Sequence, residues 1–75
     1  MSEHEKQSFR FGKVAVERGY LTPTQLHQAL GEQVEDDLEN RPHRVLGAIC
    51  FDHGWITPAQ IEEVLNIMFK KRDNL

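Results

Sequence analysis

Residues 19–25 read Gly-Tyr-Leu-Thr-Pro-Thr-Gln, and residues 54–60 read Gly-Trp-Ile-Thr-Pro-Ala-Gln. In each stretch the glycine suits the left-handed conformation that commonly closes a helix. The threonine can cap the next helix, the proline suits its first position, and the glutamine completes a capping box. The two stretches therefore predict the same turn between helices, used twice in the chain.

The similarity extends to both sides of these turns. When residues 10–33 are placed over residues 45–68 without a gap, six positions are identical and several others keep their apolar character. The identical pairs are Gly12/Gly47, Gly19/Gly54, Thr22/Thr57, Pro23/Pro58, Gln25/Gln60 and Leu30/Leu65. Such a match predicts one helix–turn–helix unit used twice, with repeat one at 10–33 and repeat two at 45–68.

Apolar residues at helical spacing on either side of each turn predict four helices. We expect Ser8 to cap the first helix and the second helix to continue to about Leu38. Each helix pair has one apolar face and cannot bury it alone. The sequence therefore predicts an all-α, compact bundle of four helices from two tandem helix-turn-helix repeats. The predicted domain spans residues 8–72, after a flexible N-terminus at 1–7, with Tyr20 and Trp55 closing its ends.

Length and composition limit the classes of function. The chain has 75 residues, which is enough for one domain. Its net charge of −3 opposes a basic face for a nucleic-acid polymer. No apolar run approaches the ~20 residues of a membrane span, and no signal peptide is visible. With one cysteine no internal disulfide can form, so we expect a soluble cytoplasmic protein without membrane insertion.

The sequence predicts no enzyme activity, cofactor or metal. Neither a phosphate-binding glycine-rich loop nor a dinucleotide fingerprint is present. Cys50 and His53 are one helical turn apart, but a zinc site needs three or four ligands and no second pair is visible. Cys50 also aligns with Ala15 of the first unit, which favours a small core residue.

One polar pair indicates a ligand site. Gln33 shares the apolar face of the second predicted helix, and Arg10 has a similar place on the first helix, so both are expected to border one seam. Gly12 would let a flat ligand approach the backbone. The paired donors of arginine beside a glutamine amide suit a guanine edge or a phosphate. The alternative is that both side chains lie at the edge of the core and face water.

Surplus apolar residues indicate a second buried surface. Four of them lie off the main apolar stripes of their helices: Val16, Phe51, Ile67 and Phe69. In so small a domain they favour a contact with another protein or with a second copy of the chain. The alternative is that they are ordinary exposed apolar residues.

The stretch from Arg10 to Gln33 (RFGKVAVERGYLTPTQLHQALGEQ) and its second copy (VLGAICFDHGWITPAQIEEVLNIM) resemble a known motif. They are similar to the tandem motif of the N-terminal domain of type II secretion and type IV pilus assembly ATPases. The resemblance covers 48 of the 75 residues. It implies a regulatory or docking module, and in some members of that family both motif copies bind cyclic di-GMP.

The resemblance assigns roles to positions of this chain. Arg10 and Gln33 match the polar contact positions of the motif. Its packing positions are matched by Gly12, Val14, Gly19, Leu26 and Leu30. The second copy has Val45 and Met68 in place of the arginine and glutamine, and Arg44 stands one residue early. From the resemblance we therefore expect one chain to present at most half of the nucleotide site, on a stand-alone version of the domain.

Three functions remain open from the sequence. The first is a protein-interaction or adaptor module that keeps the scaffold without the nucleotide. The second is a small cyclic di-GMP receptor that uses Arg10, Gly12, Gln33 and Arg44. The third is a helix–turn–helix DNA-binding protein, which the negative charge opposes.

Overall fold

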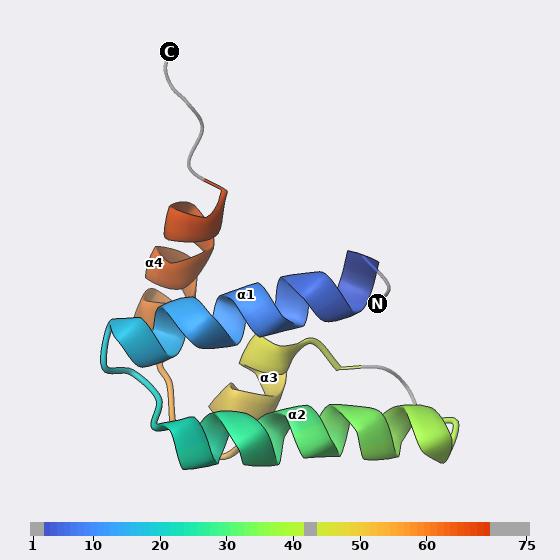
Figure 1. The fold of residues 1–75 in the computed structure, drawn as a ribbon. Helices are drawn as coiled ribbons and strands as arrows, with labels where there is room; N and C mark the ends of the chain where they lie inside the picture. Colours follow the sequence, from blue (N-terminus) through green and yellow to red (C-terminus); the bar gives the residue numbers. More distant parts are fainter. Residues whose placement is uncertain (1–2, 42–43, 70–75) are drawn as a thin grey trace.

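The computed structural model describes residues 3–41 and 44–69, which form four α-helices and no strand (Figure 1). The helices are α1 (Glu3–Glu17), α2 (Pro23–Leu38), α3 (Leu46–Asp52) and α4 (Pro58–Met68). This arrangement confirms the predicted all-α bundle, and α2 ends at Leu38 as expected. Within the described ranges, no helix has both the length and the apolar character needed to cross a bilayer.

The turn after α1 and the turn after α3 have the same backbone geometry. Gly19 has a φ of 82° and Gly54 has a φ of 78°. Both values lie in the left-handed region that glycine adopts without the steric cost of a Cβ atom. The sequence prediction that these two glycines follow the ends of helices is confirmed.

The helices that follow these turns begin with the same cap. The Thr22 amide donates to Oε1 of Gln25 at 2.9 Å, and the Gln25 amide donates to Oγ1 of Thr22 at 3.1 Å. Thr57 and Gln60 make the same two bonds at 3.0 and 3.1 Å. These pairs satisfy amide groups that have no partner within the helix. Both predicted capping boxes are confirmed.

The predicted start of the first helix is wrong. Helix α1 begins at Glu3, so residues 3–7, expected to be flexible, are helical. Ser8 therefore lies inside α1 and caps nothing. It is buried, and its Oγ accepts a hydrogen bond from Nε2 of Gln33. The remaining parts of the predicted N-terminus and domain, residues 1–2 and 70–72, lie outside the described residues.

The core forms where the two halves of the chain meet. Helix α1 contacts the other three helices, and α3 lies between α1 and α2 (Figure 1). Ten buried apolar residues make up the core: Phe11, Ala15, Leu21, Leu26, Ala29, Leu46, Ile49, Cys50, Ile56 and Val64. Five of them come from each half, so each half buries the apolar face of the other. Tyr20 and Trp55 pack against this core at its edge.

Candidate functional site

The predicted ligand contact Gln33 lies in the interior of the structure. Its side chain is only 7% exposed. Its Nε2 atom donates to Oγ of Ser8 at 2.9 Å and to the carbonyl oxygen of Arg44 at 3.1 Å. Because a buried amide needs partners, these bonds explain why a glutamine occupies an apolar face. The amide therefore joins α1, α2 and the segment before α3.

Arg10 lies on another side of α1. It is exposed, and its Nη2 atom donates to the carbonyl oxygen of Met68 at 3.3 Å, at the end of α4. Arg10 is two residues from Ser8, which corresponds to about 200° around the helix. The expectation that Arg10 and Gln33 border one seam is therefore wrong. They do not face a common ligand position.

The space beside Gly12 is filled by the protein itself. A Cβ atom at this position would overlap Cδ1 of Leu26 and lie 3.2 Å from its Cγ. The missing side chain lets α2 approach α1 closely. Gly12 therefore serves helix packing, and the expected approach of a flat ligand does not apply to this arrangement.

Arg44, the fourth predicted ligand residue, is held by carboxylates of α2 and α3. Its guanidinium lies 3.1 Å from Asp36, 3.3 Å from Asp52 and 3.5 Å from Glu32. The Asp36 side chain is buried, and its hydrogen bond is the main cause that raises the pKa of Arg44 above its ordinary value. We call these four residues the Arg44 cluster. Of the predicted ligand residues, the structure brings together only Gln33 and Arg44, through a main-chain carbonyl.

The four predicted partner residues do not share one surface. Phe51 and Phe69 line the same groove. Ile67 borders a separate shallow hollow, where Arg18 pairs with Glu63. Val16 is partly buried and packs against the core. Two of the four predicted residues therefore remain as candidates for one common interface.

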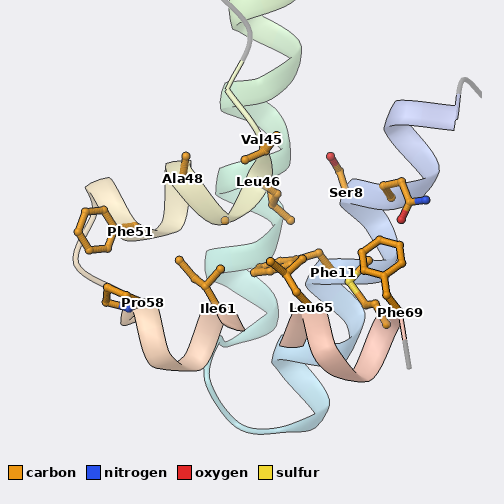
Figure 2. Close-up of a pocket in the computed structure, with 13 residues that line it drawn as sticks. Ser8, Phe11, Val45, Leu46, Ala48, Phe51, Pro58, Ile61, Leu65 and Phe69 are labelled. Atoms are coloured by element: carbon orange, nitrogen blue, oxygen red, sulfur yellow. The ribbon is translucent and has the colours of Figure 1, made fainter. Parts of the chain in front are cut away.

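The groove lies between α1, α3 and α4 and has a volume of about 570 Å³ (Figure 2). None of the described residues that line it is charged. They are Gln7, Ser8, Phe11, Val45, Leu46, Gly47, Ala48, Phe51, Pro58, Ile61, Leu65, Met68 and Phe69. Such a lining can hold apolar side chains but offers little chemistry for catalysis. The groove is the candidate functional site.

Large, exposed apolar side chains surround the groove. We call Val45, Phe51, Leu65 and Phe69 the rim; their exposed fractions are 60, 50, 40 and 52%. Beneath them Phe11 and Leu46 are buried and form part of the floor. Gly47 lets the Phe11 ring pack closely against α3, because a Cβ atom at this position would lie only 3.2 Å from Cζ of Phe11.

Two rim residues were not identified as partner residues from the sequence. Leu65 was noted only as the repeat position equivalent to Leu30, and α4 leaves it exposed beside the groove. Val45 drew notice only because it stands where the motif has an arginine. The signal that could have identified Val45 was its apolar side chain, because the residue before a helix is commonly polar.

Cys50 belongs to the buried core. It is fully buried, and this burial, followed by the nearby Glu32 carboxylate, raises the pKa of the thiol to about 11. His53 stacks on Trp55 with ring centroids 4.2 Å apart and contacts Glu32. Within residues 3–41 and 44–69, no group of three or more side chains of metal-ligating type is close enough to hold an ion.

Native Cys50 is expected to resist thiol reagents at pH 8. With a pKa of about 11, only about one thiol in a thousand is ionised at that pH, and the reactive form is the thiolate. Reaction with a chromogenic disulfide should therefore be slow in the folded protein and fast in denaturant. A matched control is Phe51→Cys in a Cys50→Ala background, because position 51 is half exposed. Equal reaction rates for Cys50 in native and denatured protein would contradict this placement.

No protein-family model matches the chain, and no curated protein or solved structure is detectably similar to it. The resemblance to the secretion and pilus ATPase domains therefore stays a prediction from the motif. Because no similar protein was found, the function is argued from the geometry of the groove.

Proposed function

We propose that this chain is a non-enzymatic docking module that binds an apolar helix of a protein partner in the groove. The observation that supports the proposal is the rim: four large apolar side chains, each at least 40% exposed, around one hollow. Contiguous exposed apolar surface is uncommon on small monomers and marks binding sites. Removing this surface from water supplies the free energy of binding.

A helix is the partner element that fits the shape best. The groove is bounded by helices, with α1 beneath and α3 and α4 on its sides (Figure 2). An amphipathic helix can place apolar side chains from successive turns into such a groove. The volume of about 570 Å³ suits a few anchoring side chains. Few anchors commonly provide most of the binding energy of an interface.

The resemblance adds support, because it implies a regulatory or docking role. The cyclic di-GMP alternative has less support, since Gln33 is buried with its amide engaged and Arg10 faces α4. The DNA-binding alternative is opposed by the net charge of −3. Docking through the groove is the function that agrees best with the observed geometry.

The test is a selection of helical peptides on the wild-type protein, followed by affinity measurements on variants. In the rim variant, Phe51→Ser and Phe69→Ser remove two half-exposed side chains from the groove. We expect selected peptides to bind this variant at least about tenfold more weakly, which corresponds to roughly 1.4 kcal/mol.

The matched control is Phe9→Ser. Phe9 is also half exposed, but it is not among the groove residues. This variant should bind the selected peptides as the wild type does. A selection that yields no binder, or binders with equal affinity for the rim variant and the wild type, would overturn the proposal.

A further inference from the structure

We infer that α4 is a movable wall of the groove, which a latch of Arg18, Tyr20 and Glu63 holds closed against α1. The inference rests on the proposed function, because it describes how the same groove opens and closes. Three observations support it: the shallow burial of α4, the turn that joins α4 to the core and the hydrogen bonds that hold its middle.

Helix α4 is buried less deeply than α3. Of the eleven residues of α4, all of which the structure describes, only Val64 is buried. Four of the seven residues of α3 are buried. Helix α3 packs against both α1 and α2, whereas α4 packs mainly against α1 and lies away from α2 (Figure 1). Elements with few buried contacts open at a lower free energy than the rest of a protein, so we expect α4 to open before α3.

The repeat shows why α4 is held less firmly than α2, its equivalent in the first half. Gln33 of α2 corresponds to Met68 of α4. The buried amide of Gln33 joins α2 to α1 and to the segment before α3 by two hydrogen bonds. Met68 lines the groove instead, and a thioether is only a weak hydrogen-bond acceptor. The buried polar connection of α2 therefore has no counterpart at this position of α4.

The turn before α4 provides a pivot. Ile56 is buried and belongs to the core. The capping box of Thr57 and Gln60 keeps the first turn of α4 helical from Pro58 onward. A change in ψ of Ile56 and φ of Thr57 would therefore move α4 as a rigid body while the turn stays anchored.

The latch holds the middle of α4 against the end of α1. Nε of Arg18 donates to Oε2 of Glu63 at 3.0 Å, and Nη2 of Arg18 donates to the same oxygen. The hydroxyl of Tyr20 donates to the other carboxylate oxygen, Oε1. The side chains of Arg18 and Glu63 are 51 and 37% exposed, so water reaches the latch. Its bonds can therefore break without unfolding of the core.

The latch is complete at neutral pH. Hydrogen bonds from Tyr20 and then from Arg18 lower the pKa of Glu63 below its ordinary value. The bond to Glu63 is also the main cause that raises the pKa of Tyr20. A lowered carboxylate pKa means that the latch contributes above the ordinary carboxylate range and is lost as the pH falls through the lowered value. At pH 7 the carboxylate is ionised and the phenol is protonated, which is the state that the latch requires.

Opening of α4 changes the groove directly. Ile61 and Leu65 line the groove from α4, and Leu46 lines it from α3. Movement of α4 away from α3 widens the hollow and exposes Val64. A helix that contacts both walls binds only when α4 is in place. Docking is therefore expected to favour the closed position of α4.

The first test is amide hydrogen exchange of the free wild-type protein, followed by NMR at pH 7. After correction for the intrinsic rates of the sequence, we expect the amides around Val64 in α4 to exchange faster than those around Cys50 in α3. Equal corrected rates in α3 and α4 would overturn the inference, because α4 would then open only together with the core.

The second test compares Glu63→Ala, which removes the latch, with Glu62→Ala. Glu62 is the matched control, because it is exposed and borders the same hollow outside the latch. We expect the amides of α4 to exchange at least about threefold faster in Glu63→Ala than in Glu62→Ala, a size typical of an exposed ion pair with an added hydrogen bond. The amides of α3 should exchange equally in the two variants. Equal exchange of α4 in both variants, or an equal acceleration of α3 and α4 in Glu63→Ala, would overturn the latch.

This inference and the proposed docking fail separately, because the exchange is measured without a peptide. Selected peptides that bind through the rim of a protein whose α4 opens only with α3 overturn the inference and leave docking supported. A latch that controls the opening of α4, together with a failed peptide selection, supports the inference about α4 and overturns docking.

Discussion

Replacing Ile49 by alanine is expected to lower the free energy of unfolding by about 2–5 kcal/mol. Ile49 lies in α3 and is fully buried between the two halves of the chain. The loss combines the transfer free energy of the removed methyl and methylene groups with the cavity that they leave. A chain of 75 residues has a total stability of roughly 4–11 kcal/mol, so this change removes a large share.

Urea unfolding followed by circular dichroism at low protein concentration measures this effect without a contribution from self-association. Ile67→Ala is the matched control, because Ile67 is 40% exposed and lies outside both the core and the groove. It should change the free energy of unfolding by less than about 1 kcal/mol. Similar losses for the two variants would show that α3 is not the centre of the core.

Replacing Gln33 by leucine is expected to cost about 1–3 kcal/mol of stability although it adds an apolar side chain to the interior. The leucine has no donor for the carbonyl oxygen of Arg44, which Nε2 of Gln33 now satisfies at 3.1 Å. The Ser8 hydroxyl loses its partner as well. The unsatisfied oxygens then lie in a poorly solvated place, and that desolvation is the cost.

Gln28→Leu is the control for this change, because Gln28 lies on the exposed side of the same helix. Thermal and urea unfolding should show little effect of that substitution. If Gln33→Leu were as stable as Gln28→Leu, the buried amide would have no structural role. The interpretation of Gln33 as a nucleotide contact would then regain support.

Local sequence signals predicted most of the secondary structure. A glycine followed after two residues by Thr-Pro-x-Gln was sufficient for both turns, since the atoms involved are within a few residues of one another. The same reasoning placed the first helix too late. Ser8 resembles a cap, but the tertiary partner Gln33 uses its hydroxyl inside α1 instead.

The candidate site was harder to predict. Phe51 and Phe69 were identified because they lie off the apolar stripes, but Val16 and Ile67 met the same criterion and belong elsewhere. Helical spacing gives the direction of a side chain around its own axis. It does not say whether a neighbouring helix covers that direction, and this decides between core and groove.

The sequence by itself determined where the turns lie and that the chain is all-α, because caps and left-handed glycines act over a few bonds. Only the tertiary structure decided that Gln33 reaches Ser8 and Arg44, and that α1, α3 and α4 leave a hollow between them. Both features depend on the angles and distances at which helices pack. Those depend on the fit of all the core side chains together, including the close contact of Leu26 with Gly12.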